Sequence, residues 1–434
     1  MKQLLPGLPP RFAAWRILHD VRHGVPFDVA LHRAIRDLEP DDKRLAHELA
    51  AGVFRSRSTL DTALGVVVER GLASVRPDTL DVLRIGAFQI LHLDRVPEHA
   101  AVATTVGVAR RLGDRKVAGF VNAVLRKLGT RREADAAPLP VADLAERHSH
   151  PAWLVDRWVA RFGPEETARL LVRNNTRPSL VIQPARWSRA DLESAWRAQG
   201  IEFRPAPFDA GLVVTVRKPA DLPGFREGGF QVQDPAQRLV VRYLAPAVKG
   251  LLFDACASPG GKAIALAAPG RFVLAADRTR VRVKRLAENI TRAGGPDIAV
   301  IQADALHPPI RRADAVLLDV PCLGTGTLAR NPDARWRVTR EAIDTLRDQA
   351  ARVLARQADV VAPGGLLLFA TCSLEPEENE EQIARFLDAD RRFRREPSEN
   401  VPAELLNSDG DLLLLPQRHG TDGAYAARLR KIAE

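Results

Sequence analysis

The sequence predicts a multidomain protein in which an all-α bundle precedes an α/β domain of the Rossmann type. Two patterns support this fold class. Apolar residues recur at helical spacing through residues 1–130. From about residue 236, short apolar runs alternate with longer amphipathic stretches, which is typical of a doubly wound parallel sheet. As a third observation, acidic residues or cysteines stand where several apolar runs end, which places a candidate ligand site at one edge of that sheet.

Size and composition limit the class of protein. With 434 residues the chain is long enough for roughly three domains, and a hydrophobic fraction of 46% provides for a core. No apolar run approaches the ~18 residues of a membrane span. Pro6 and Gly7 interrupt the first apolar residues before a signal-peptide core could form. We therefore expect a cytoplasmic protein that does not enter a membrane.

Charge and cysteine usage point to possible partners. The net charge of +10 favours nucleic acid, although an arginine-rich genome composition would give the same charge. Three cysteines are too few for a disulfide framework, and none belongs to a CxxC pair. We expect reduced thiols, no metal and a monomeric protein.

Residues 1–130 predict a basic helical bundle. Phe12, Trp15 and Leu18 repeat at helical spacing, and residues 117–128 follow the i, i+3, i+4, i+7 rule. The block contains 20 Lys and Arg residues against 14 Asp and Glu residues, a net charge of +6. Such a bundle is either a structural cap with a solvated, charged surface or an RNA-binding domain.

Several motifs of this block resemble the NusB-type antitermination fold. They are Asp42–Ala46, Gly52–Arg55, Leu83–Gln89, Val96–Val102 and Phe120–Arg126. The resemblance spans nearly the whole block, and it implies a helical domain that binds RNA.

A linker and a small subdomain are predicted next. Residues 131–150 are charged and then rich in alanine and proline, which suits an exposed connection. Residues 151–235 begin with a helical pattern and contain strand-like runs at 179–182 and 212–216, which predicts a small α/β subdomain. Residues 236–434 then form the Rossmann-type domain.

Strands and helices alternate through this last domain. The strands are expected at Leu251–Asp254, Phe272–Asp277, Ile298–Ala303, Ala315–Asp319 and Leu366–Thr371. The helices are expected around 262–268, 279–293, 339–358 and 377–388. The fifth strand follows a turn at Gly364 and runs through apolar residues, as a strand buried on both faces does. The first helix is expected to be short, because few residues separate Lys262 from Phe272.

The loop after the first strand is a candidate cofactor site. Gly260 and Gly261 let the backbone approach a ligand closely. The loop is neither GxGxxG nor a Walker motif, so a pyrophosphate cofactor is disfavoured. Asp277 ends the second strand 23 residues beyond Asp254, close to the spacing at which an acid typically binds ribose hydroxyls.

Acids also end the third and fourth strands, at Asp304 and Asp319. Each could instead cap the following helix, but four strand-end acids beside a glycine loop favour a nucleoside ligand without phosphates. S-adenosylmethionine fits, because it presents a ribose, an adenine and an amino-acid end. The residues expected to bind it are Cys256, Ala257, Ser258, Pro259, Gly260, Gly261, Lys262, Asp277, Asp304 and Asp319. We expect Cys256 to act through its backbone and not in catalysis.

Two cysteines stand at neighbouring strand ends. Cys322 follows the fourth strand in a Pro-Cys motif, and Cys372 follows the fifth in a Thr-Cys-Ser motif. Cysteines so placed are well sited for nucleophilic chemistry, although a free cysteine is more often a small buried hydrophobe. Both thiols can line the pocket at Asp319, because the carboxyl ends of parallel strands share one edge.

Taken together, the motifs resemble those of RNA (cytosine-C5) methyltransferases of the 16S rRNA RsmB (Fmu/Sun) type, which carry an N-terminal NusB-like domain. The matching segments are Asp254–Lys262, Asp319–Gly326, Asn331–Trp336 and Ala370–Asn379. The resemblance covers nearly the whole chain and implies S-adenosylmethionine-dependent methylation of cytosine C5 in 16S rRNA. It implies that Cys372 adds to cytosine C6 and that Cys322 assists release of the product. Asp319 is the candidate for the contact with cytosine N3.

Other interpretations stay open on sequence alone. In the DNA cytosine-C5 enzymes the Pro-Cys thiol is the nucleophile, so the roles of the two thiols rest on the family. The same chemistry could act on tRNA or another rRNA, because the motifs do not encode the target. A non-catalytic RNA-binding or antitermination protein is disfavoured by the intact acids and cysteines. Asn331, Arg335, Trp336 and Arg337 suit an RNA loop, with Trp336 equally suited to packing.

Overall fold

The chain divides into two compact units. The computed structural model describes residues 6–113, 115–133, 143–216, 218–245, 249–295 and 297–432. The helical unit comprises Met1–Thr176 and Asn331–Arg337, and the α/β unit comprises Arg177–Arg330 and Val338–Glu434. Residues 134–142 of the predicted linker lie outside the described residues. The four-part division expected from the sequence stays a prediction.

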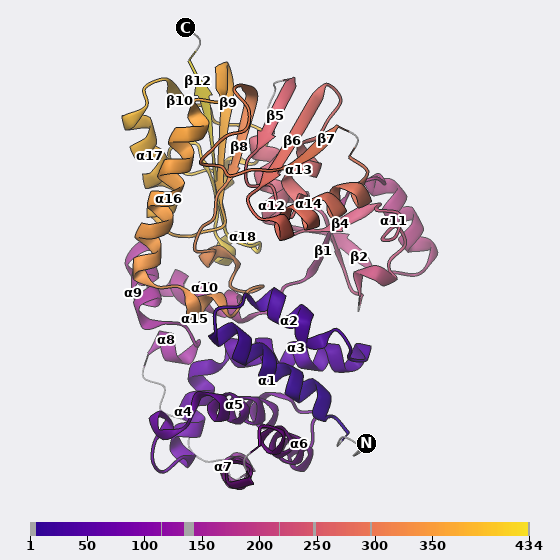
Figure 1. Cartoon of the computed structure of the whole chain (residues 1–434), viewed down its shortest axis with the longest axis vertical. Helices are drawn as coiled ribbons and strands as arrows, with labels where there is room; N and C mark the ends of the chain where they lie inside the picture. The colour runs from indigo at the N-terminus through magenta and orange to yellow at the C-terminus, as the bar shows by residue number, and fades with distance from the viewer. Residues whose placement is uncertain are drawn as a thin grey trace. The chain divides into compact units, whose positions relative to one another are not determined.

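The bundle of the helical unit is confirmed as all-α in the part of it that is described (Figure 1). Its helices are α1 (Leu8–Arg22), α2 (Phe27–Ile35), α3 (Pro40–Arg55), α4 (Arg57–Val67), α5 (Pro77–His92), α6 (Glu98–Arg111) and α7 (Arg115–Glu133). Proline occupies the first turn of α1, α3 and α5, where its missing N–H breaks no helical hydrogen bond. Leu18 is buried in the core, and Phe12 and Trp15 pack against the same core, as their spacing predicts.

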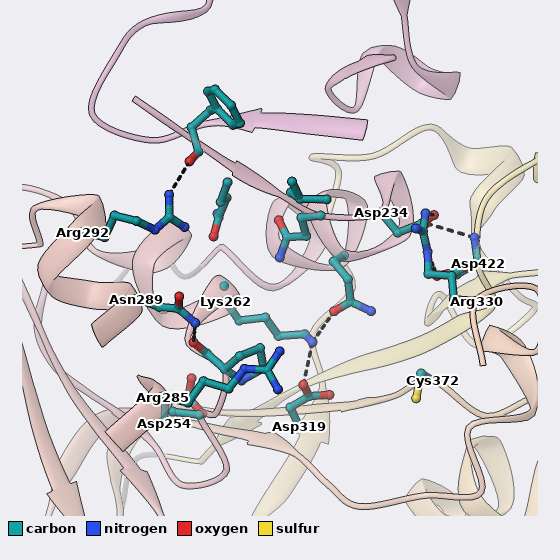
Figure 2. A pocket seen from close by; sticks show the side chains of 18 of the residues that line it. Asp234, Asp254, Lys262, Arg285, Asn289, Arg292, Asp319, Arg330, Cys372 and Asp422 are labelled. Atoms are coloured by element: carbon teal, nitrogen blue, oxygen red, sulfur yellow. Dashed lines mark hydrogen bonds and ion pairs between the residues drawn. The ribbon is translucent and has the colours of Figure 1, made fainter. Parts of the chain in front are cut away.

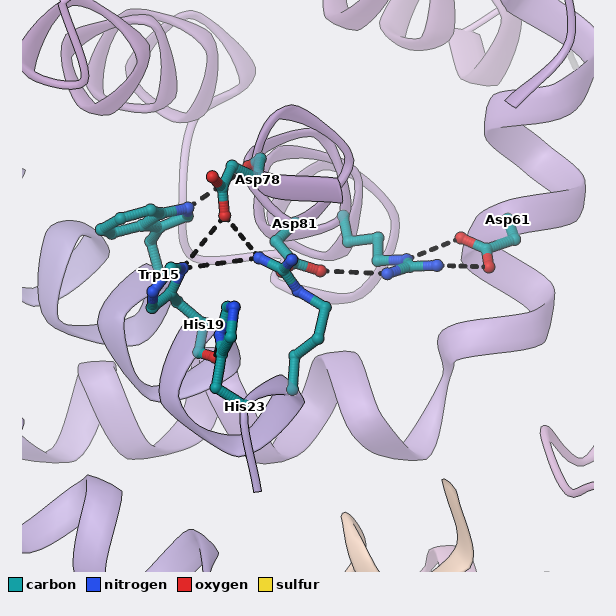
Figure 3. A network of polar contacts seen from close by, with 8 residues as sticks. Trp15, His19, His23, Asp61, Asp78 and Asp81 are labelled. Carbon is teal, nitrogen blue, oxygen red and sulfur yellow. Dashed lines mark hydrogen bonds and ion pairs between the residues drawn. The ribbon is translucent and has the colours of Figure 1, made fainter. Parts of the chain in front are cut away.

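A chain of ion pairs joins α1, α5 and α4 within this bundle (Figure 3). Arg22 of α1 bonds to Asp78 and Asp81 of α5. Arg84 of α5 bonds to Asp81 and, with two nitrogen–oxygen distances of 2.8 Å, to Asp61 of α4. Burial raises the pKa of Asp81, against the opposing effect of Arg84 and Arg22. Such a network specifies which helix faces meet more than it adds net stability.

The rest of the helical unit includes a segment from far along the sequence. The remaining helices of the unit are α8 (Leu144–Arg147), α9 (Ala152–Phe162) and α10 (Pro164–Asn175), and the distant segment contributes α15 (Ala334–Arg337). Arg335 of α15 is fully buried, and its guanidinium donates to Asn175 Oδ1 at 2.6 Å and to Asn174 O at 3.0 Å. Burial lowers the pKa of Arg335 to about 9. Arg335 therefore serves the fold, and the expectation that its side chain helps to bind an RNA loop is wrong, because it is not accessible.

Trp336 takes the packing role that the sequence left open. Its ring contacts the core of the bundle, and its indole N–H donates to Phe54 O at 2.8 Å. The guanidinium of Arg57 lies 5.0 Å from the centre of the Trp336 ring, within range of a cation–π interaction. The side chain is thus held by the helical unit on more than one side.

The α/β unit begins with a small antiparallel sheet in the order β2-β3-β1-β4 (Figure 1). The elements are β1 (Leu180–Pro184), α11 (Arg189–Ala198), β2 (Phe203–Pro205), β3 (Leu212–Val214) and β4 (Phe230–Val232). Both predicted strand-like runs are confirmed as β1 and β3. Trp196 of α11 is fully buried, with its ring 6.0 Å from that of Phe230, so the helix covers one face of this sheet.

The large sheet has the order β10-β12-β9-β8-β5-β6-β7, with β11 paired to β12. Its strands are β5 (Gly250–Asp254), β6 (Arg271–Asp277), β7 (Ile298–Gln302), β8 (Ala313–Asp319), β9 (Val361–Thr371), β10 (Phe393–Arg395), β11 (Leu412–Leu414) and β12 (Ala424–Lys431). The five predicted strands are present. They lie side by side in the order β9-β8-β5-β6-β7, and each pair of neighbours in this group is parallel. However, β12 is antiparallel to β9, so the sheet is mixed and not purely parallel.

Helices cover this sheet on both faces, which confirms the Rossmann-type fold (Figure 1). They are α12 (Pro235–Leu244), α13 (Gly261–Leu266), α14 (Arg280–Ala293), α16 (Arg340–Ala358) and α17 (Glu380–Ala389), and the single-turn helix α18 (Pro416–His419) precedes β12. Along β9, Leu366 and Leu368 belong to the core beneath α12 and α13, while Leu367 and Phe369 belong to the core beneath α16 and α17. The continuous apolar run of β9 therefore buries both faces of a central strand. Helix α13 is short, as expected.

Candidate active site

The carboxyl ends of the parallel strands bring the predicted residues to one edge of the large sheet. Asp254, Asp277 and Asp319 are the last residues of β5, β6 and β8, and Cys372 directly follows β9. Asp304 lies two residues beyond the end of β7. Strand ends that neighbour one another in a parallel sheet must converge, so residues from distant parts of the sequence meet here.

Two adjoining cavities open at this edge, where the sequence predicted one crevice. The Lys262 cavity has a volume of about 530 Å³ and is lined by Lys262 and Asp254 among others (Figure 2). The Asp277 cavity has a volume of about 420 Å³ and is lined by Asp277 and Asp304 among others. Both cavities are lined by Cys256, Asp319 and Cys372. The two cavities therefore share Asp319 and Cys372, two of the three residues predicted for chemistry, whereas the third, Cys322, lines the Asp277 cavity.

The glycine loop between β5 and α13 leaves no room for larger side chains. Gly260 has φ of 108°, a backbone conformation that favours glycine, and a Cβ there would lie 2.9 Å from Leu286 Cδ1. A Cβ on Gly261 would lie 2.7 Å from Gln233 Nε2, at the wall of the Lys262 cavity. Gly261 thus lines the cavity with its backbone, and Gly260 makes the turn that precedes it.

Asp277 and Asp304 have different surroundings. Asp277 is buried, accepts a hydrogen bond from the Ser258 backbone N–H at 3.3 Å, and pairs with Arg282 at 3.0 Å. Asp304 is partly exposed and accepts from the Leu306 N–H at 3.0 Å, so it caps the turn after β7. Asp304 therefore has the alternative role that we considered for a strand-end acid, because it caps the backbone that follows it. Its side chain also lines the Asp277 cavity.

Asp254 is an unusual buried acid. Its side chain is 1% exposed, and Oδ1 accepts from the Cys256 N–H at 3.4 Å. Its Oδ2 has no hydrogen-bond partner among the described residues. Burial, and next the nearby charge of Asp319, raises the pKa of Asp254 to about 7. A buried carboxyl oxygen without a partner at a cavity wall is a natural acceptor for a ligand that donates.

Lys262 bonds to the acid between the two cavities. Its Nζ lies 2.6 Å from Asp319 Oδ2 and also donates to Gln237 Oε1 (Figure 2). Lys262 is buried, so this ion pair is shielded from solvent more than a surface pair. The sequence placed Lys262 with the cofactor loop alone, whereas the structure brings its charge to the residue predicted to contact the base.

The two predicted thiols lie side by side. The Sγ atoms of Cys322 and Cys372 are 3.4 Å apart, and the Cys372 backbone N–H donates to Cys322 Sγ at 3.3 Å. The hydrogen bond with Cys372, burial and the charge of Glu378 raise the pKa of Cys322 well above that of an ordinary thiol. Cys322 is therefore a protonated, neutral thiol at neutral pH.

The loops that carry the thiols are fixed to one another by backbone contacts. Gly326 N–H donates to Cys372 O at 3.0 Å, and Gly423 N–H donates to Gly326 O at 2.7 Å. A Cβ on Gly326 would lie 2.7 Å from Gly423 Cα, so these loops approach too closely for any side chain. Leu374 N–H donates to Thr325 Oγ1 at 2.8 Å, which adds a third link. This arrangement sets the separation of the two sulfurs.

Cys256 differs from the other two cysteines. It lies in the glycine loop and contributes to both cavities. Burial, together with Asp254, raises the pKa of this thiol strongly, so it is not a nucleophile at neutral pH. The expected role of its backbone in cofactor binding stays a prediction.

Sequence reasoning missed a salt-bridge hub at the wall of the Lys262 cavity. Arg330 donates to Asp234 and, at 2.8 Å, to Asp422 (Figure 2). Asp234 also caps α12 and accepts from the Asp422 N–H at 3.0 Å. The only sequence signal was the Asp-Pro pair that begins α12, which predicts a helix start and says nothing of Arg330.

Two further features bear on the class of protein. Among the described residues, no group of three or more His, Cys, Asp or Glu side chains is arranged to hold a metal ion. The described helices include none that is both long and apolar enough to cross a membrane.

The fold and this site define a Rossmann-type methyltransferase joined to a helical unit of the NusB type. The 16S rRNA methyltransferase RsmB/F family matches residues 241–430, the NusB family residues 9–130, and the RsmF/B-like ferredoxin-like domain residues 150–221. The chain is 36% identical to the probable ribosomal RNA small subunit methyltransferase B of Synechocystis, with 97% of this chain and 99% of the relative covered. It is 32% identical to ribosomal RNA small subunit methyltransferase B of Vibrio cholerae, with 93% and 92% covered. The chain therefore belongs to the small subunit methyltransferase B (RsmB) family, which confirms the resemblance drawn from its motifs.

Solved structures agree on the fold. One crystal structure covers 99% of this chain with a TM-score of 0.83 at 24% identity. A methyltransferase homologue from Pyrococcus horikoshii covers 67% of this chain and 99% of its own, with a TM-score of 0.58 at 26% identity.

Proposed function

We propose that this protein transfers a methyl group from S-adenosylmethionine to C5 of a cytosine in 16S rRNA, through a covalent adduct between Cys372 and cytosine C6. The observation that carries the proposal is the pair of sulfurs 3.4 Å apart where two cavities meet at Asp319. One cavity can hold the methyl donor and the other the base, with the attacking thiol between them. The names of the relatives supply the RNA target.

The Asp277 cavity fits S-adenosylmethionine. The loop that carries Gly260 and Gly261 contributes Cys256 and Ser258 to its wall. Asp277 is a buried acid at the end of the second strand, where such folds bind ribose. When bound, this cofactor supplies an electrophilic methyl group on a sulfonium.

The chemistry needs activation of the base, because C5 of cytosine is a weak nucleophile. The thiolate of Cys372 forms a bond to C6, which makes C5 an enamine-like carbon able to attack the methyl group. At the cavity wall, the protonated carboxyl group of Asp319 can donate its hydrogen to cytosine N3 as negative charge develops on the ring, and Lys262, 2.6 Å from Asp319 Oδ2, stabilises the carboxylate that this leaves. The Asp319–Lys262 pair therefore orients the base and stabilises its charge.

Release of product restores the enzyme. The proton on C5 leaves to a base, the ring regains its double bond, and the bond between C6 and the sulfur of Cys372 breaks with return of the electron pair to sulfur. Cys322 is a neutral thiol 3.4 Å from that sulfur, so its S–H can donate a hydrogen bond to the departing thiolate. This gives Cys322 a role in release and not in attack.

Bisulfite sequencing tests the proposal directly. RNA from cells with and without the gene is compared, and one protected cytosine in 16S rRNA should disappear on deletion. Restoring the wild-type gene should return it, whereas the Cys372→Ala gene should not. A protected cytosine lost instead from tRNA or another rRNA would keep the chemistry and reject the 16S target. No change in any RNA would reject the proposed methylation of cytosine C5.

A further inference from the structure

The Lys262 cavity extends beyond the residues that the chemistry uses. Cys372 and Arg292 of α14 lie at opposite sides of the cavity, with Lys262 and Asp319 between them (Figure 2). A single cytosine at Cys372 leaves the Arg292 end of the cavity for something else. An RNA substrate necessarily brings neighbouring nucleotides with the target base.

The far end combines an aromatic ring with an arginine held in place. The Arg292 guanidinium lies 5.6 Å from the centre of the Phe225 ring, and its Nη1 donates to Phe230 O at 3.0 Å. Phe225 is half-buried and lines the same cavity. An aromatic ring beside a fixed guanidinium is the surface on which single-stranded bases stack.

Helix α14 adds positive charge beside this surface. Within Arg280–Ala293 there are five Lys or Arg residues and one Glu, a net charge of +4. Arg285 is exposed to solvent and lines the cavity about two turns before Arg292. Lys284, next to it, is exposed but does not line the cavity. A cation at the rim of a cavity of this kind suits a phosphate of the RNA backbone.

The same helix is tied to the predicted cofactor loop. Asn289 donates to Pro259 O at 2.9 Å, and Arg282 donates to Ser258 O at 3.3 Å. At the other end of the helix, Arg292 donates a hydrogen bond to Phe230 O of β4. Helix α14 is thus a rigid support, and residues on it hold a fixed position relative to the reacting thiols.

We propose that Arg285, Arg292 and Phe225 form a subsite for the nucleotide next to the target cytosine. The base of that nucleotide stacks at Arg292 and Phe225, and Arg285 contacts its phosphate. This inference rests on the proposed function, because it takes single-stranded RNA as the substrate. The catalytic part of the chain then contributes its own RNA contacts in addition to those expected from the helical unit.

The test compares Arg285→Ala with the matched control Lys284→Ala, which removes the same charge from the same helix outside the cavity. Affinity of the full chain for a single-stranded RNA oligonucleotide containing one cytosine is measured over a range of salt concentrations. Arg285→Ala should lower the slope of log affinity against log salt by about 0.7, the value for one single-strand phosphate. Lys284→Ala should leave that slope as in the wild type.

Phe225→Leu tests the stack while keeping an apolar contact with Phe230. Its affinity for the oligonucleotide should fall roughly 5- to 100-fold, the loss of one stacked base. Unchanged S-adenosylmethionine affinity in each variant shows that the fold is intact. An Arg285→Ala slope equal to that of Lys284→Ala, or wild-type RNA affinity in Phe225→Leu, would overturn the subsite. Failure of the proposed function would appear separately, as absence of 5-methylcytosine from RNA treated with the wild-type protein.

Discussion

Replacing the two active-site thiols one at a time should have opposite effects on a covalent protein–RNA complex. Cys322→Ala leaves Cys372 free to attack but removes the S–H group 3.4 Å from its sulfur. A hydrogen bond to a charged group contributes about 1.5–3 kcal/mol, so its loss should slow expulsion of the thiolate roughly 10- to 150-fold. The covalent complex should therefore accumulate in Cys322→Ala.

The assay is a denaturing gel of protein incubated with labelled rRNA and S-adenosylmethionine, sampled over time. Cys322→Ala should show a slow-migrating complex that persists, and methyl transfer to the trapped RNA should still be detectable. Cys372→Ala should show neither the complex nor methyl transfer. Cys256→Ala serves as a control for loss of a thiol at the same cavities, and it should trap no RNA.

The reverse pattern would refute this assignment. A complex trapped by Cys372→Ala and absent from Cys322→Ala would make the Pro-Cys thiol the nucleophile, as in the DNA enzymes. A complex absent from both variants would reject covalent catalysis.

Three further predictions concern the cofactor, the fold and the RNA. Asp277→Ala should weaken S-adenosylmethionine binding roughly 10- to 150-fold in calorimetry, the loss of charged hydrogen bonds, and wild-type affinity would reject the cofactor assignment. Asp254→Asn should raise the melting temperature of the cofactor-free protein at about pH 8 but not at about pH 4. Burial raises the pKa of Asp254 to about 7 in the folded state, so the folded protein must bury a charged carboxylate above that pH. Asparagine removes this cost at about pH 8, whereas at about pH 4 the carboxyl group is already neutral in the folded state. Equal shifts in melting temperature at both pH values would contradict this. A chain beginning near residue 140 should keep cofactor binding but lose rRNA affinity, with a flatter salt dependence, and an unchanged salt slope would reject an RNA role for residues 1–130.

Local patterns in the sequence predicted the parts of the site that lie on single strands. The acids at 254, 277 and 319 end apolar runs, so their shared edge follows from the parallel topology. Strand β12 was missed because Ala424, Ala426 and Ala427 have low strand propensity and gave no strand signal. Its burial against β9 comes from tertiary packing, which no local pattern encodes.

Long-range polar contacts were beyond the reach of spacing arguments. Arg330 joins Asp234 and Asp422, which lie 96 and 92 residues away along the chain. Lys262 reaches Asp319 across 57 residues. The sequence predicted both Lys262 and Asp319 as site residues, but only the folded chain pairs them. Helix starts and glycine turns can be predicted locally, whereas ion pairs of this kind cannot.

The segment Asn331–Arg337 changes what removal of the bundle would test. In sequence it follows the loop of Cys322, yet by its contacts it belongs to the helical unit. Trp336 bonds to Phe54 within residues 1–130, whereas the partners of Arg335 lie in 149–175. A chain that begins near residue 140 therefore keeps the partners of Arg335 and loses those of Trp336.

Loss of methyl transfer in such a chain would then have two possible causes, weaker RNA binding or a displaced segment. The two separate experimentally, because only lost phosphate contacts flatten the salt dependence of RNA affinity. In the full chain, Trp336→Phe removes the indole N–H donor to Phe54 while keeping an aromatic ring in the core. If the segment positions the Cys322 loop, this variant should lower the rate of methyl transfer at saturating RNA with no change in salt slope. A wild-type rate in Trp336→Phe would leave RNA binding as the contribution of the helical unit.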